Sequence, residues 1–134
     1  MTVTLSCPKT MPPPAGYSHV AEVTKGKLIL IAGQVAHDTN GNLVGENDFK
    51  AQVEQVFKNV EAALNAAGGG FHNLVKINNY CVASVDPAQI AAFREVRDRY
   101  VNTAAPPVST FIVVSRLVRP GWLFEMDAMA VIDA

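Results

Sequence analysis

The chain has 134 residues, the usual size of one domain with a single hydrophobic core, so residues 1–134 are expected to form one domain without a separate cofactor-binding unit. Its 11 Lys and Arg residues nearly balance its 12 Asp and Glu residues, and this net charge of −1 argues against a nucleic-acid partner. Hydrophobic residues make up 49% of the chain and charged residues only 17%, which favours self-association because a small domain cannot easily cover that much apolar surface.

The cysteine pattern and the hydrophobic runs predict a cytoplasmic protein without metal or membrane partners. Cys7 and Cys81 lie far apart, with no Cys or His at ligand spacing, so neither a disulfide framework nor a zinc site is expected. The longest aliphatic run, residues 28–32, is far shorter than the ~20 residues of a membrane helix and lies too far into the chain for a signal peptide.

The first third of the chain predicts strands and turns. Residues 8–14 hold four of the eight prolines and are expected to be extended, because proline lacks an amide donor. Residues 19–24 and 27–32 favour strands, and the short turn between them predicts a hairpin. Asn40-Gly41 predicts a tight turn within residues 35–44, since both residues tolerate positive φ.

Two helices are predicted further along. Apolar residues recur at three- and four-residue steps from about residue 48 to 67, and Gly68-Gly69-Gly70 ends this helix. After a strand at 73–82, Asp86-Pro87 predicts the start of a second helix that runs to about residue 101. The expected inner face of that helix consists of Ile90, Phe93, Val96 and Tyr100.

The chain ends in two more predicted strands, at 108–115 and 124–132, with a turn near Arg119-Pro120-Gly121. This order predicts an α+β fold in which two helices cover one face of a sheet. Strand segments such as residues 111–114 are too apolar to face water, so another copy of the chain is expected to cover the second face.

Several features that resemble functional motifs have simpler interpretations. Gly68-Gly69-Gly70 follows a helix, whereas a phosphate-binding loop opens one. His19, His37 and His72 are too widely separated to form a local metal motif, although His19 lies close to Tyr17. Ser109 lacks the glycine pattern of a hydrolase nucleophile, so a strand hydroxyl is the simpler interpretation.

Glu125 and Asp127 are candidate functional carboxylates. They lie two residues apart on a predicted strand and therefore share a face. If that face is buried between copies, a carboxylate there is costly unless it is paired, and such groups often serve function. The alternative is an ion pair at the rim with Arg116, Arg119 or Lys27.

Short blocks in a defined order carry a family resemblance. The blocks are Ala15-Gly16-Tyr17-Ser18, Ile31-Ala32-Gly33-Gln34, residues 52–68, Val75-Lys76, Tyr100, Pro107-Val108-Ser109-Thr110 and residues 124–131. Together they resemble the signature blocks of the RidA/YjgF family. The resemblance implies a chorismate-mutase-like fold with a mixed, largely antiparallel sheet, and a homotrimeric barrel with small-molecule clefts between subunits. It also implies hydrolysis of reactive imines or enamines to a 2-oxo acid and ammonia, without metal or cofactor.

The resemblance assigns roles to individual residues. Tyr17, Gly33, Gln34 and Glu125 match family positions, and Glu125 is expected to position the attacking water as the catalytic residue. The substrate-binding set that it predicts is Tyr17, Ala32, Gly33, Arg97, Ser109 and Phe111.

The chain departs from the family pattern at three of these positions. Ser109 stands where deaminating members have the Arg that holds the substrate carboxylate, Ala32 replaces the usual Ser, and Arg97 replaces the usual Asn. Because a serine hydroxyl offers no charged fork, the standard activity on 2-iminobutanoate or 2-iminopropanoate is not expected.

Two functional outcomes remain from the sequence. The chain is a hydrolase of another imine-like compound, either one without a carboxylate or one whose carboxylate meets Arg97 or Arg116. Alternatively, it is a non-catalytic trimer that binds a metabolite or another protein.

Overall fold

The computed structural model describes residues 2–133 and contains six strands and two α-helices. The elements are β1 (Val3–Ser6), β2 (Val20–Val23), β3 (Lys27–Gln34), α1 (Phe49–Ala66), β4 (Leu74–Val82), α2 (Ile90–Tyr100), β5 (Val108–Val114) and β6 (Phe124–Ile132), with short 3₁₀ turns at Phe71–Asn73 and Pro87–Gln89. The main sheet has the order β3-β6-β4-β5, in which only the β4–β5 pair is parallel.

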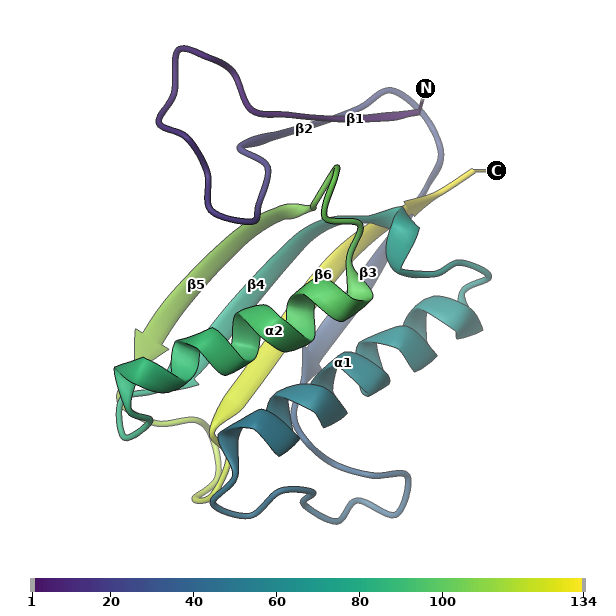
Figure 1. The fold of residues 1–134 in the computed structure, drawn as a ribbon. Coiled ribbons are helices and arrows are strands. Elements are labelled where there is room, and N and C mark those ends of the chain that lie inside the picture. The colour runs from purple at the N-terminus through teal and green to yellow at the C-terminus, as the bar shows by residue number, and fades with distance from the viewer. Residues whose placement is uncertain (1, 134) are drawn as a thin grey trace.

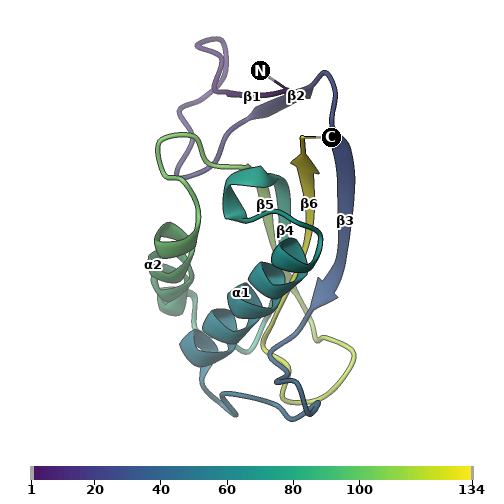
Figure 2. The ribbon, with the colours of Figure 1, turned by 90° about the vertical axis from the view of Figure 1, so that its right-hand side faces the viewer.

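Both α-helices pack on the same face of this sheet (Figure 1), and the edge-on view separates the helical layer from the strands (Figure 2). The predicted α+β architecture, with two helices over a mixed sheet, is therefore confirmed.

The core lies between this sheet and α1. The Asp48 carboxylate caps the helix by accepting from the Ala51 amide, and one stripe of the helix is buried, as the apolar spacing predicts. Phe57, fully buried in the middle of the stripe, stacks against Phe71 and Tyr100 at centroid distances of 6.0 and 5.2 Å. This packing holds α2 beside α1.

The predicted hairpin of residues 19–24 and 27–32 is wrong. β2 pairs with β1, a strand that the sequence did not reveal, while β3 pairs along its length with β6. At the turn between them, Gly26 has a φ of 119°, and a Cβ there would lie 2.6 Å from the Val131 side chain. The chain therefore leaves the small β1-β2 sheet at Gly26 and enters the main sheet. There β3 pairs with β6 over a longer stretch than the four residue pairs that join β1 to β2.

The predicted turn at Asn40-Gly41 is confirmed. Gly41 has a φ of 80°, and one oxygen of Asp38 accepts from the amides of Asn40 and Asn42 at 2.9 Å each. The second helix begins at Ile90 rather than at Pro87, after a 3₁₀ turn capped by the side chain of Asp86.

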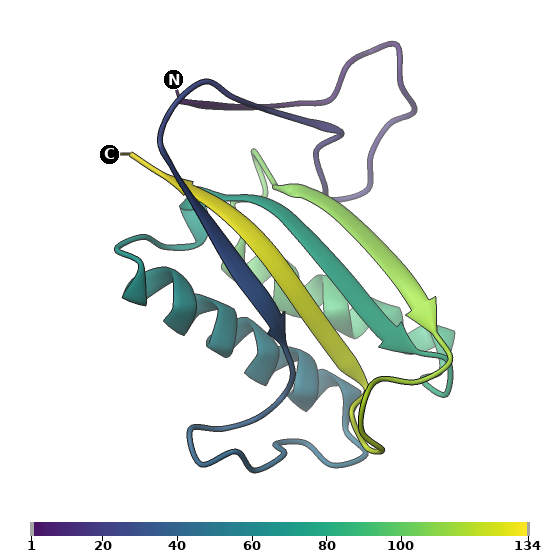
Figure 3. The same cartoon turned by 180° about the vertical axis from the view of Figure 1, so that it is seen from behind.

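The face of the sheet opposite the helices is covered by neither α-helix (Figure 3). Its exposed side chains include Leu28, Leu30, Ile112 and Met129, which are 40–67% exposed. Apolar groups of this size gathered on one face are typical of a surface that is covered in an assembly. No helix among the described residues is long and apolar enough to cross a bilayer.

Candidate functional site

A pocket of about 360 Å³ lies between α2 and β5, beside the loop that connects β1 to β2. It brings together Tyr17, Arg97, Ser109 and Phe111 from the predicted site. The full lining is Ala15, Tyr17, Ile90, Phe93, Arg94, Arg97, Ser109 and Phe111.

Arg97 is the most unusual residue of this pocket. Its side chain is only 9% exposed, although it lies on a surface helix. The Nε atom donates to Asp98 at 2.9 Å, and the guanidinium carbon lies 5.7 Å from the centre of the Phe93 ring. Within residues 2–133 Nε is the only Arg97 nitrogen that makes a hydrogen bond, and the two Nη atoms are not among the buried atoms without a partner, so they reach solvent. The site therefore contains a buried cation whose outer end is free.

Gly16 lies directly against this guanidinium. Its φ is 79°, and a Cβ at this position would lie 2.2 Å from Nη2 of Arg97. Glycine is thus required both by the left-handed backbone and by the space that the cation occupies. The backbone of the loop and the Phe93 ring together hold the guanidinium in place.

The loop that carries Gly16 is itself anchored. Ser18 is buried, and its hydroxyl donates to the Pro106 carbonyl at 2.6 Å. Tyr17 meets His19 edge-on at 5.3 Å, and a ring nitrogen of His19 lies 2.7 Å from the Pro12 carbonyl oxygen. These contacts fix Tyr17 at the mouth of the pocket.

Ser109 has a hydroxyl that is free to donate. Asn79, which is 1% exposed, uses its amide nitrogen to donate to the Thr110 carbonyl at 3.0 Å and to Ser109 Oγ at 3.1 Å. Because a carbonyl can only accept, this arrangement fixes the orientation of the amide. Ser109 Oγ is therefore an acceptor toward Asn79, and its proton has no acceptor among the described residues.

Glu125, Gly33 and Ala32 lie elsewhere, at the edge of the open face. A Cβ on Gly33 would lie 2.1 Å from Glu125 Oε2, so the carboxylate rests against the Gly33 backbone. Burial raises the pKa of Glu125, and the negative charge of Asp127 raises it further. The Glu125 carboxylate makes no hydrogen bond within residues 2–133, whereas the exposed Ala32 accepts one from Gln34 through its carbonyl. Glu125 is thus available to a ligand or a water molecule.

The raised pKa of Glu125 predicts how stability depends on pH. The folded state holds this proton more tightly than the unfolded chain does, so the contribution of Glu125 to stability falls as pH rises through the raised pKa. We therefore expect Glu125→Gln to raise the melting temperature near pH 7 and to change it little near pH 4, close to the ordinary Glu pKa. Thermal unfolding followed by circular dichroism measures this. An equal shift at both pH values would show that the burial of Glu125 has no effect on its proton.

Asp127 does not form the alternative ion pair. Its two oxygens accept from the Asn78 amide and from the Tyr80 hydroxyl at 2.7 Å each. The bond to Asp127 is the largest cause that raises the pKa of Tyr80. Arg116 instead donates to the Val118 carbonyl, and Arg119 lies over the Trp122 ring. Glu125 and Asp127 do share a face, as predicted, but no cation pairs with either within residues 2–133.

Within one chain, the predicted site residues form two separate groups. Ser109 and Phe111 point toward the helices, as the 5.0 Å ring contact of Phe111 with Phe93 requires. Glu125 points to the opposite face of the sheet, on a strand separated from β5 by β4. We call these groups the pocket half (Tyr17, Arg97, Ser109 and Phe111) and the acid half (Ala32, Gly33 and Glu125).

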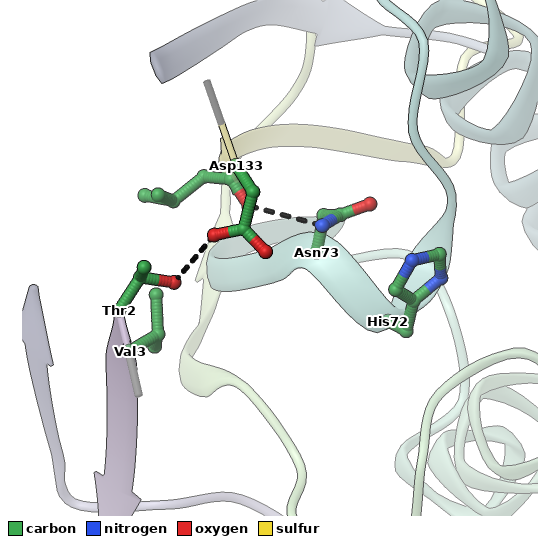
Figure 4. Close-up of a pocket in the computed structure, with 6 residues that line it drawn as sticks. Thr2, Val3, His72, Asn73 and Asp133 are labelled. Carbon is green, nitrogen blue, oxygen red and sulfur yellow. Dashed lines mark hydrogen bonds between the residues drawn. The ribbon is translucent and has the colours of Figure 1, made fainter. Parts of the chain in front are cut away.

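Another hollow lies where the two ends of the chain meet (Figure 4). Thr2 donates to Asp133 at 3.0 Å, and Asn73 donates to the Val131 carbonyl at 3.1 Å. The first bond joins the two ends of the described chain, the second joins the 3₁₀ turn at Phe71–Asn73 to β6, and His72 also lines the hollow. We assign this hollow a structural role.

Some pocket residues were not predicted as part of the site. Phe93 and Ile90 were expected only as the inner face of a helix, and Gly16 only as part of a signature block. Asn79 gave no signal, because an asparagine in a strand is ordinarily exposed, and its burial under Ser109 depends on the pairing of β4 with β5.

Both cysteines are free, Cys7 exposed and Cys81 buried.

The fold and this pocket define a class of small α+β proteins with two helices on one sheet face. The sequence model described as Endoribonuclease L-PSP matches residues 8–132. Protein DfrA of Myxococcus xanthus is 35% identical over 124 residues, which cover 92% of this chain and 88% of that protein. The RutC family protein slr0709 of Synechocystis is 31% identical and covers 98% of both chains.

Solved structures agree. A crystal structure of the conserved Rid-family protein YyfB from Yersinia pestis, described as of unknown function, superposes with a TM-score of 0.88 at 36% identity, covering 98% of this chain and 100% of that one. The chain belongs to the RidA/YjgF family, also described as Endoribonuclease L-PSP.

Proposed function

We propose that the protein is a homotrimer with small-molecule clefts between its subunits, and that it hydrolyses an imine- or enamine-like metabolite other than the standard 2-imino acids. The observation that carries this proposal is the Glu125 carboxylate, which is partly buried, rests on the Gly33 backbone and has no partner within residues 2–133. Burial raises the pKa of this carboxyl, which makes it a stronger base than an ordinary Glu.

The separation of the two half-sites supports an assembly. The pocket half faces the helical layer at the β5 edge, and the acid half lies on the open face near β3 at the other edge. A cleft built from the pocket half of one copy and the acid half of another would complete the site. The exposed leucines of β3 and Met129 of β6 give the open face a reason to be covered.

The proposed reaction needs only water and the carboxylate. Glu125 takes a proton from water as the oxygen bonds to the imine carbon, the C=N π electrons move to nitrogen, and Glu125 gives that proton to the nitrogen. Glu125 then carries the hydroxyl proton of the carbinolamine to the same nitrogen, the C–N bond breaks, the C=O bond forms and ammonia leaves. General-base assistance of this kind contributes ~100-fold or more.

The test is the decay of imines generated in situ, followed by absorbance and by release of ammonia. We expect faster decay with imines that carry larger side chains, little acceleration with 2-iminobutanoate, and loss of ~100-fold in rate in Glu125→Gln. Glu46→Gln, an exposed acid outside both half-sites, is the matched control and keeps the wild-type rate.

A second candidate is a metabolite-binding trimer without turnover, which the serine at position 109 favours because the family's carboxylate-holding Arg is absent. Imine decay that is no faster with the wild type than in buffer would select it. Light scattering that gives the mass of a single 14.4 kDa chain would contradict both candidates.

A further inference from the structure

We infer that Arg97 of α2 is the anion-binding residue of the pocket and that the ligand is a small carboxylate with an apolar substituent. The inference rests on the proposed function in one respect, that the pocket holds a small molecule. It does not depend on chemistry at Glu125.

The first argument is the unpaired end of the guanidinium. Arg97 is nine-tenths buried, yet only Nε is engaged, by an Asp98 carboxylate that is itself about half exposed. The Nη groups are not among the buried atoms that lack a partner, so they reach solvent at the pocket and are open to an anion that enters it. A carboxylate in the pocket would accept from the Nη groups in place of water through charge-assisted hydrogen bonds.

The second argument is that the cation is held ready. Gly16 leaves the space that the guanidinium fills, and the Phe93 ring supports it at 5.7 Å. An arginine fixed in this way loses little further freedom when it binds an anion. Arg94 lines the same pocket but is exposed, and it lies over no aromatic ring among residues 2–133.

The third argument is a second donor in the same pocket. Ser109 Oγ accepts from Asn79, so its own proton is directed to another acceptor. The serine that replaces the family arginine thus contributes a neutral hydrogen bond, while the charge comes from α2 instead of β5.

The remaining lining selects the rest of the ligand. Ile90, Phe93 and Phe111 offer apolar surface, and a volume of about 360 Å³ accepts a ligand with an aromatic or branched aliphatic group. A carboxylate with only a methyl or ethyl substituent would leave much of this surface in contact with water.

The experiment compares phenylacetate with phenylacetamide, which has nearly the same shape without the charge, by calorimetric titration of the full chain. We expect phenylacetate to bind and the amide to bind about tenfold or more weakly. Arg97→Gln is expected to weaken the binding of phenylacetate by a similar factor and to leave the affinity for phenylacetamide unchanged. Arg97→Lys keeps the charge but loses the planar fork, so it is expected to bind at an intermediate level.

Arg119→Gln is the matched control, because it removes the same charge from an exposed site outside the pocket. If Arg97→Gln does not fold, the acid-against-amide comparison in the wild type and the Arg97→Lys titration still decide. Equal affinity for acid and amide, or full affinity in Arg97→Lys, would overturn the inference.

The outcomes separate this inference from the proposed function. Arg97-dependent binding of phenylacetate without any Glu125-dependent imine decay would support the anion site and reject the hydrolase. Imine hydrolysis that is lost in Glu125→Gln but unchanged in Arg97→Gln would reject the anion site alone.

Discussion

Replacing Gln52 by leucine is expected to lower the free energy of unfolding by about 3 kcal/mol or more. Gln52 is fully buried on α1. Its amide nitrogen donates to the carbonyls of Gly45 and Gly121 at 3.0 and 2.8 Å, and its oxygen accepts from the Leu123 amide at 2.9 Å. Leucine fills the volume but leaves these backbone groups without their partner, at about 1–3 kcal/mol for each one that stays buried.

The control for this variant is Asn65→Leu, which exchanges an exposed amide on the same helix. Surface exchanges of this kind change stability by about 0.5 kcal/mol or less. Urea unfolding followed by fluorescence of Trp122 and by circular dichroism measures both variants. Equal midpoints for the two leucine variants would mean that Gln52 does not join the loops to the helix.

Gly16→Ala is expected to weaken phenylacetate binding about tenfold or more, in addition to a stability loss of about 1–2 kcal/mol from its left-handed backbone. The added Cβ would lie 2.2 Å from Nη2 and 2.7 Å from Cζ of Arg97, so the guanidinium must move out of its place. Calorimetric titration measures the affinity, and thermal unfolding measures the stability.

Gly41→Ala separates the two effects. Gly41 has nearly the same φ, 80°, but nothing lies within 4 Å of a Cβ built there. The Gly41→Ala variant therefore carries the same loss of stability from its left-handed backbone but no steric clash. Its affinity for phenylacetate is expected to equal that of the wild type. If both alanine variants bind equally well, the position of the Arg97 guanidinium does not matter for the ligand.

Much of the helical layer was predictable because its signals are local. The three- and four-residue spacing located α1 to within one residue at each end, and the Asp48 side chain caps it. The same spacing could not show that Gln52 is buried, since its partners Gly45, Gly121 and Leu123 belong to loops that only the fold brings to the helix.

Strand positions were similarly predictable, but strand partners were not. The aliphatic run of β3 shows that it is a strand, whereas its pairing with β6, at the other end of the chain, depends on the whole sheet. β1 was missed because four residues give too little alternation to detect, and its pairing with β2 removed the expected hairpin.

The sequence by itself determined the fold class, the two helices, the turn at Asn40-Gly41 and the shared face of Glu125 and Asp127, because each depends on spacing along the chain. Only the tertiary structure decided that Arg97 is buried with a free outer end against Gly16, and that Glu125 lies on the opposite face from Ser109. The physical reason is that burial, and the loss of partners that comes with it, depends on what packs above a residue, and residues distant in the chain provide that cover.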